Sequence, residues 1–161
     1  IYNKNNNNFA KRIEHVVEQC QRVSDAVKLT LEDGFFPIVL SGDHSSALGT
    51  ISGIKAATPD KRLGVIWIDA HADLHSPFTS PSGNIHGMPL AAAIWEDNID
   101  CKINEPGTTT EMHWGNMKKI GTATKKILPQ DLIYFGLRDF ESAEAHIIEK
   151  EKIYHCCCGC D

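Results

Sequence analysis

Three side chains that can bind a metal ion lie in one short stretch, Asp69-Ala70-His71-Ala72-Asp73. The stretch follows the apolar run 63–68 directly, so it begins where a predicted strand ends. If the backbone stays extended, positions i, i+2 and i+4 point to one side and bring the three side chains together. Two carboxylates and an imidazole without a thiolate suit Mn²⁺, Mg²⁺ or Fe²⁺ better than a structural zinc.

Other candidate residues follow apolar runs or lie in a loop nearby. His44 comes after the run 36–40, His86 lies in a loop before a predicted helix, and Asp139, Glu141 and Glu144 come after the run 131–137. Each has an ordinary alternative: His44 as a capping residue, His86 as an exposed loop histidine, and the acidic group as a solvated helix start. A shared location at the carboxyl ends of strands favours a common site, because ligands of open α/β sheets bind there.

The elements that must position these residues are short. Apolar runs at 36–40, 63–68 and 131–137 lack alternation and predict strands buried on both faces of a mainly parallel sheet. Helices are predicted over 9–31 with a stop at Gly34, over 47–57, from Pro89 to Trp95, and over 145–150. The first two strands and the helix between them form a predicted βαβ unit of neighbouring strands. Residues 96–130 show no clear period, and no linker divides 1–161, which predicts a single domain.

Composition restricts the classes of protein. In 161 residues, 42% are apolar and 23% are charged, which is typical of a globular domain. The net charge of −5 argues against nucleic acid as a partner, and no apolar run approaches the roughly 20 residues needed to span a membrane. The first residue is Ile1 and not methionine, so we expect the true start to lie upstream.

Both ends of the chain have biased composition. Asn5 to Asn8 form a polar run, and we expect residues 1–8 to be disordered. Four of the six cysteines fall within 155–161, a tail for which we predict no element. No second CxxC or histidine pair completes a tetrahedral site for that tail. Cys20 and Cys101 are interpreted as small neutral residues and not as a disulfide, which predicts an intracellular protein.

Four motifs together resemble the ureohydrolase family, and within it the arginases. They are Ser41-Gly42-Asp43-His44-Ser45, Trp67-Ile68-Asp69-Ala70-His71-Ala72-Asp73, Ser82-Gly83-Asn84-Ile85-His86-Gly87-Met88-Pro89, and Gly136-Leu137-Arg138-Asp139 with Glu144. They occur in the order and at the spacing of the family, and the resemblance covers roughly residues 10–150.

The resemblance implies a three-layer α/β/α fold and a site for two Mn²⁺ ions. His44, Asp69, His71 and Asp73 match four metal ligands, with Asp69 bridging the ions. In arginases a hydroxide held between the ions attacks the guanidinium carbon of L-arginine, giving ornithine and urea. His86 matches the histidine that transfers protons, a role in which an imidazole both accepts and donates a proton. The family further implies a cytoplasmic protein that is a homo-oligomer at full length.

The resemblance also assigns substrate contacts. Ser82 and Asn84 match positions that contact the α-carboxylate, while Asp139 and Glu144 match positions that face the α-amino group. Two residues depart from the family pattern. His75 stands where many arginases have an asparagine that contacts the α-carboxylate, and Glu141, near the positions that face the α-amino group, stands where an aspartate is usual. Both are candidate substrate contacts.

The family's later Asp-x-Asp pair and a later glutamate have no counterpart in these 161 residues. We therefore expect a fragment lacking both ends, with an incomplete fold and weak or no activity. Two alternatives remain open. Another ureohydrolase, such as an agmatinase or formiminoglutamase, is disfavoured by Ser82-Gly83-Asn84, because a decarboxylated substrate has no carboxylate to contact. The other alternative is a non-catalytic fragment that binds metal.

Overall fold

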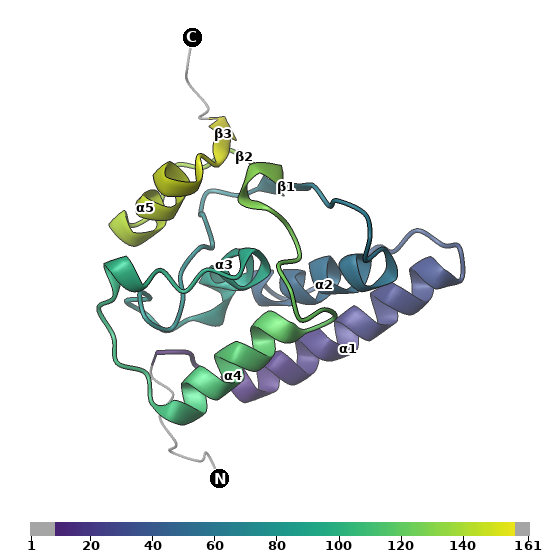
Figure 1. The fold of residues 1–161 in the computed structure, drawn as a ribbon, viewed down its shortest axis with the longest axis horizontal. Helices are drawn as coiled ribbons and strands as arrows, with labels where there is room; N and C mark the ends of the chain where they lie inside the picture. The colour runs from purple at the N-terminus through teal and green to yellow at the C-terminus, as the bar shows by residue number, and fades with distance from the viewer. Residues whose placement is uncertain (1–8, 157–161) are drawn as a thin grey trace.

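The computed structural model describes residues 9–156, in which a small parallel sheet lies at one end of a group of helices (Figure 1). Its strands are β1 (Val65–Ile68), β2 (Leu132–Phe135) and β3 (Tyr154–Cys156), in the order β1-β2-β3. Both pairs are parallel, and the register places Val65 opposite Leu132. The predicted strands at 63–68 and 131–137 are confirmed, whereas β3 was not predicted.

Five α-helices accompany the sheet in the described part of the chain. They are α1 (Ile13–Glu32), α2 (Ala47–Ala57), α3 (Pro89–Ile94), α4 (Thr108–Lys119) and α5 (Ser142–Glu151). Short 3₁₀ turns cover η1 (His44–Ser46), η2 (Ile85–Gly87), η3 (Ile99–Cys101) and η4 (Pro129–Asp131). The four predicted helices are confirmed. Helix α4 was missed because its buried apolar residues, Trp114 and Met117, are too few to form a periodic stripe.

Helices α1 and α2 pack closely because α2 presents glycines to α1. A Cβ atom on Gly49 would lie 2.6 Å from the carbonyl oxygen of Cys20, and one on Gly53 would lie 2.5 Å from that of Ser24. Any larger residue at either position would push the helices apart. The tight contact therefore fixes the start of α2, and with it the turn η1 that precedes α2.

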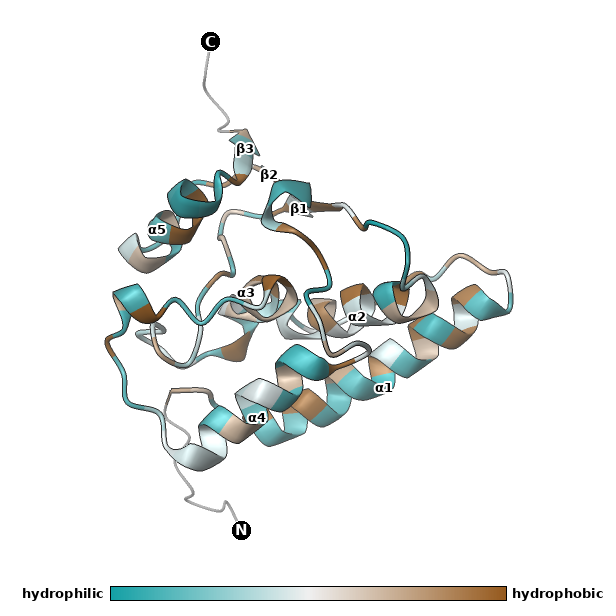
Figure 2. Cartoon of the chain, viewed as in Figure 1, coloured by the Kyte–Doolittle hydropathy of each residue, from teal (hydrophilic) through white to brown (hydrophobic). Residues whose placement is uncertain are grey.

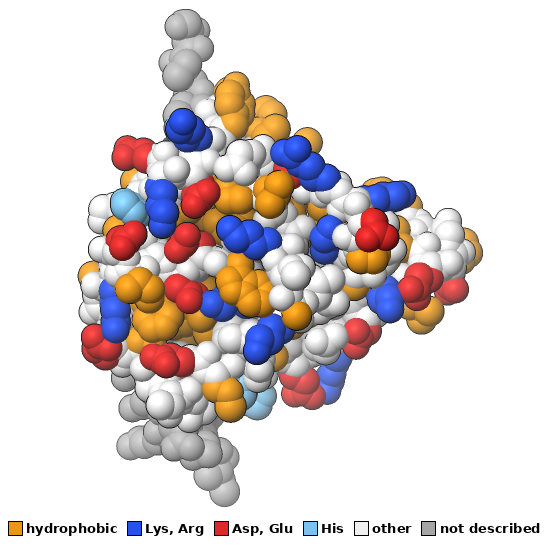
Figure 3. Space-filling view, viewed as in Figure 1, with side chains coloured by type: hydrophobic (Ala, Val, Ile, Leu, Met, Phe, Trp, Pro, Cys, Tyr) orange, Lys and Arg blue, Asp and Glu red, His pale blue; other side chains and the backbone are white. Residues whose placement is uncertain are grey.

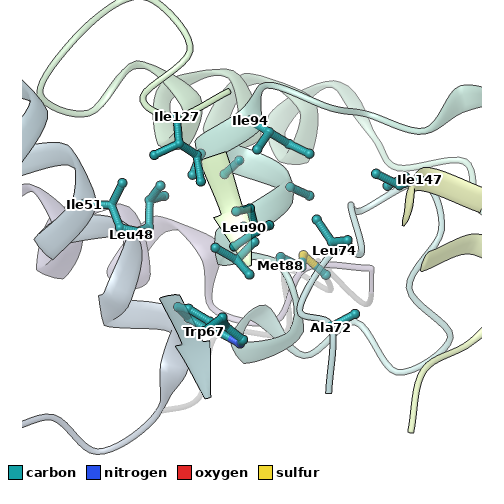
Figure 4. Packing of buried hydrophobic residues seen from close by; sticks show 14 of the residues in the cluster. Leu48, Ile51, Trp67, Ala72, Leu74, Met88, Leu90, Ile94, Ile127 and Ile147 are labelled. Atoms are coloured by element: carbon teal, nitrogen blue, oxygen red, sulfur yellow. The ribbon is translucent and has the colours of Figure 1, made fainter. Parts of the chain in front are cut away.

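The core lies between the helices and one face of the sheet (Figure 4). Trp67 from β1 and Tyr134 from β2 point into it, and Leu48, Leu90 and Ile147 from three helices join them. The hydropathy pattern agrees, since the brown segments of α2 and α3 lie towards the middle of the molecule (Figure 2). Burial of this apolar surface is the main force that holds the sheet on the helices.

The other face of the sheet is open among residues 9–156. Ile66 and Ile68 of β1 are 66% and 79% exposed, and Phe135 of β2 is 44% exposed. The prediction that these strands are buried on both faces is therefore wrong for the described part. A strand whose sheet is covered on both faces is a near-continuous apolar run. The described helices cover only one face of this sheet. Figure 3 shows apolar side chains at the surface at the end of the molecule that carries the sheet.

Residues 36–40 were predicted to form a buried strand, and this prediction is wrong. The segment has no strand pairing, and Phe36, Ile38 and Leu40 are 87%, 81% and 94% exposed. A strand needs a neighbour for its N–H and C=O groups, and within 9–156 the only strand paired with β1 is β2. The segment is therefore not the neighbour of β1 that the predicted βαβ unit required.

These open surfaces predict self-association of the chain as given. An exposed strand edge and apolar face attract another chain, so we expect concentration-dependent oligomers in sedimentation velocity. The double variant Ile66→Lys/Ile68→Lys should shift the distribution towards monomer, because like charges on the open face repel. Leu29→Lys is the matched control, because it changes an exposed apolar side chain on α1 and not on the sheet. It should leave the distribution unchanged. A monomeric unmodified chain would contradict the prediction.

Some predictions concern residues at the limits of the described chain. The expected disorder of 1–8 and most of the cysteine-rich tail lie outside the described residues, while His155 and Cys156 form part of β3. Cys20 and Cys101 are free thiols, and burial raises the pKa of Cys20 to about 11. None of the helices between residues 9 and 156 is long and apolar enough to cross a membrane.

Candidate metal centre

His44 is held in place by its own turn and not by a strand. Asp43 caps η1, with its Oδ1 accepting a hydrogen bond from the backbone N–H of Ser45 at 2.9 Å. Hydrogen bonds from Ser45 keep the pKa of Asp43 below its usual value. The thiol of Cys20 on α1 donates to the carbonyl of Ser45 at 3.2 Å. Capping and helix packing therefore position His44 even though residues 36–40 are unpaired.

The loop after β1 is fixed at several points. The backbone N–H of Asp69 donates to Phe135 of β2 at 3.2 Å, and the carbonyl of Asp73 accepts from Leu90 of α3 at 3.1 Å. Tyr134 donates its hydroxyl proton to the carbonyl of Ala72. Asp73 itself has φ +53°, a left-handed conformation that aspartate tolerates better than most residues. This turn directs the Asp73 side chain back towards the end of β1.

His44, Asp69 and Asp73 converge at this point. His44 Nδ1 lies 2.7 Å from Asp69 Oδ2 and 3.0 Å from Asp73 Oδ2, and the three donor atoms lie within 4.8 Å of one another. The ring of Trp67 packs edge-on against His44, with centroids 5.1 Å apart. Burial and the nearby charge of Asp69 raise the pKa of Asp73 to about 6. A divalent cation would offset this repulsion, so the donor set fits a hard metal ion.

His71 lies on the other side of Asp69. Its Nδ1 is 3.4 Å from Asp69 Oδ1, and its Nε2 is 3.5 Å from Asp139 Oδ2. The two oxygens of Asp69 thus face two different histidines, His44 and His71. A carboxylate placed in this way can bind two ions at once. Of the four predicted ligands, three meet within 4.8 Å and His71 stands beside them.

A second group of donors lies next to this centre. His75 Nε2 is 2.8 Å from Glu141 Oε2 and 3.6 Å from Glu144 Oε2, and these atoms also lie within 4.8 Å of one another. Glu141 and Glu144 form the capping box of α5. His75 Nδ1 lies 3.1 Å from the hydroxyl of Thr79, which holds the ring in place. The distances alone would allow these three residues to bind a cation. However, His75 is hydrogen-bonded to Glu141, and Glu141 is hydrogen-bonded to Glu144, so these donors already have partners.

The two glutamates differ in charge because they differ in burial. Glu144 is 3% exposed, and burial followed by the neighbouring Glu141 raises its pKa to about 8. Hydrogen bonds with Glu144 and His75 hold the pKa of Glu141 below its usual value. At neutral pH the pair therefore carries its negative charge on Glu141, the member that is exposed.

Glu144 predicts a pH dependence of stability. A carboxyl with a folded-state pKa near 8 and an ordinary value of 4.5 favours folding below pH 4.5, and this contribution is lost as pH rises through 8. In metal-free protein, Glu144→Gln should reduce the fall in melting temperature between pH 5 and 8. Glu149→Gln, at an exposed position of the same helix, should leave that fall unchanged. Equal pH profiles of melting temperature for the unmodified protein, Glu144→Gln and Glu149→Gln would contradict the raised pKa of Glu144.

A cavity of about 140 Å³ connects the metal centre with the second group. Its lining is polar and comprises His71, Asp73, His75, Ser80, Ser82, Asn84, His86, Gly87, Glu141 and Glu144. Most of the predicted substrate-contacting residues therefore share one space with two of the predicted ligands. His86 is exposed at this cavity, on the 3₁₀ turn η2.

One predicted substrate contact lies outside the cavity, and one residue near the cavity was not predicted. Asp139 does not line the cavity, since it is exposed and faces His71. Lys11 was not singled out from the sequence, yet its ammonium group donates to Asn84 Oδ1 at 3.1 Å. A lone lysine near the start of a predicted helix does not indicate a contact with Asn84, because the two residues lie 73 positions apart in the sequence.

Comparison with known proteins decides the family. Residues 3–157 match the family model described as "Arginase family". The chain belongs to the arginase family. The arginase of Bacillus caldovelox is 38% identical over 146 residues, which cover 89% of this chain and 43% of the relative.

Solved arginase structures share the fold. The Bacillus caldovelox structure matches with a TM-score of 0.80 at 34% identity, covering 98% of this chain and 46% of the other. An Entamoeba histolytica arginase in complex with L-ornithine matches with a TM-score of 0.76 at 33% identity, covering 92% and 45%. These matches confirm the predicted arginase-like α/β fold, and the chain spans less than half the length of these relatives.

Proposed function

We propose that this arginase-family chain carries part of the active site of a manganese-dependent enzyme that hydrolyses L-arginine to ornithine and urea. The observation that carries the proposal is the convergence of His44, Asp69 and Asp73 beside a polar cavity. Asp69 contacts a histidine through each of its oxygens, which suits a bridging ligand between two ions. Bound divalent ions would lower the pKa of a shared water and so supply a nucleophile at neutral pH.

The cavity suits an amino acid with a cationic side chain. Ser82 and Asn84 line one part of it, where we place the α-carboxylate. Glu141 and Glu144, with His75 between them, line another part, where we place the α-amino group. The guanidinium group would then extend towards Asp73 and the metal centre. The ornithine complex of the Entamoeba histolytica arginase supports a ligand of this class.

His86 is our candidate for proton transfer. It lies on the wall of the cavity and is exposed, so it can exchange protons with solvent. Among residues 9–156 it belongs to neither group of clustered donors, which separates it from the proposed ligands. A histidine so placed can take a proton during attack and return it to the leaving amine.

The test compares substrates on the complete gene product, because the chain covers less than half of its relatives. We expect manganese-dependent release of urea from L-arginine and little from agmatine, which lacks the carboxylate. Release from agmatine alone would indicate a different ureohydrolase. Manganese binding without turnover of either substrate would favour a non-catalytic metal-binding protein.

The 161-residue chain alone should be a poor enzyme. Mn²⁺ prefers near-octahedral coordination, and the four candidate ligands satisfy only part of two such shells. Urea release from L-arginine by the manganese-loaded chain should therefore be close to background in a colorimetric assay. Turnover within about tenfold of a typical enzyme's rate of about 10 s⁻¹ would contradict this expectation.

A further inference from the structure

Lys11 joins the residues that precede α1 to the loop that carries Ser82 and Asn84. Its backbone N–H donates to the carbonyl of Gly83 at 2.8 Å. Its Nζ donates to Asn84 Oδ1 at 3.1 Å. Both bonds reach the same short loop, so the lysine is held there by its main chain and its side chain together.

The lysine determines how the Asn84 amide is oriented. An ammonium group has only donors, so the atom of the amide that faces it must be the oxygen. The Nδ2 group of Asn84 then points the other way, and within 9–156 it makes no hydrogen bond of its own. Asn84 lines the cavity, so this orientation leaves two N–H donors for an anionic group of a ligand.

The hydroxyl group of Ser82 is also oriented by the loop. Its Oγ accepts a hydrogen bond from the backbone N–H of Asn84 at 3.2 Å, so its own proton remains available to donate. The loop is held in a left-handed turn at Gly83, with φ +69°, whose N–H donates to Ser80 Oγ at 2.9 Å. The result is a hydroxyl donor and an amide donor at the cavity, with the Lys11 ammonium group on the far side of the Asn84 amide, a combination that suits a carboxylate.

We infer that Lys11 is a specificity-determining residue that positions Asn84 and supplies positive charge for the α-carboxylate of the substrate. This inference rests on the proposed function, since it assigns a further residue to the same cavity. The lysine acts through Asn84 and does not touch the reacting atoms. Its removal should therefore weaken binding of carboxylate-bearing ligands and leave the chemical step unchanged.

The experiment uses the complete gene product with Lys11→Met, which keeps the side-chain length and removes the charge. We expect KM for L-arginine to rise about fivefold with kcat nearly unchanged, the upper range for an exposed charged contact. Agmatine turnover, however slow, should not change. Lys11→Arg should restore most of the affinity, because it restores the cation. Lys28→Met is the matched control, since Lys28 is a partly exposed lysine on α1 that is paired with Glu32 at 3.6 Å.

Calorimetric binding of L-ornithine separates this inference from the proposed function. Weaker ornithine binding by Lys11→Met than by Lys28→Met supports the inference whether or not arginine is turned over. Equal ornithine affinity for both variants overturns it, even if the unmodified protein hydrolyses arginine. Equal losses for arginine and agmatine would mean that Lys11 only stabilises the fold, and would also overturn it.

Discussion

Replacing Asp69 with asparagine in the complete gene product should lower manganese affinity by more than about 100-fold, and urea release should fall at least as far. Residues that only hydrogen-bond to a metal ligand typically contribute about 10- to 100-fold to metal affinity. A residue that itself binds two ions should therefore contribute more. Asp69 is mostly buried and lies within 3.4 Å of both His44 and His71. Asparagine keeps the size of the side chain but removes its charge. Manganese retained after gel filtration, measured by mass spectrometry, gives the readout.

Asp60→Asn is the matched control for Asp69→Asn. Asp60 is an exposed aspartate at the opposite end of β1, so its loss should leave metal content and activity unchanged. Melting temperatures of the metal-free proteins would show whether Asp69→Asn still folds. Full manganese content in a folded Asp69→Asn protein would refute the assignment of Asp69 as a bridging ligand.

Replacing His86 with asparagine should lower turnover about 100-fold or more while leaving manganese content intact. Proton transfer by a positioned side chain typically contributes on this order. His86 lines the cavity but lies apart from the clustered donors His44, Asp69 and Asp73. Steady-state kinetics together with metal analysis of the same sample separates a loss of proton transfer from a loss of metal.

Added imidazole provides a second measurement on the His86→Asn protein. If proton transfer is the missing step, imidazole should restore part of the turnover in a concentration-dependent manner. His15→Asn, which changes an exposed histidine on α1, should have no effect on turnover. Loss of manganese from the His86→Asn protein would instead identify His86 as a ligand.

Much of the site was predictable because its signals are local. The stretch from Asp69 to Asp73 combines ligand type, spacing and a preceding strand within a few residues. The helices α1 and α2 were predicted from periodicity and from stop signals such as Gly34. Capping chemistry places His44 through Asp43, and that too involves neighbouring residues. In each case the physics acts over one or two turns of chain, so the sequence pattern carries it.

Other features depend on contacts between distant residues, and only the tertiary structure decided them. Residues 36–40 are as apolar as β1, yet they are not a strand, because pairing requires a neighbour that local sequence cannot specify. The left-handed turn at Asp73 and the pairing of His75 with Glu141 depend on packing against α3 and α5. The bond from Lys11 to Asn84 crosses 73 positions. Sequence thus determined which groups could do the chemistry, while three-dimensional packing decided which of them meet, because donor atoms interact over a few ångströms regardless of their separation along the chain.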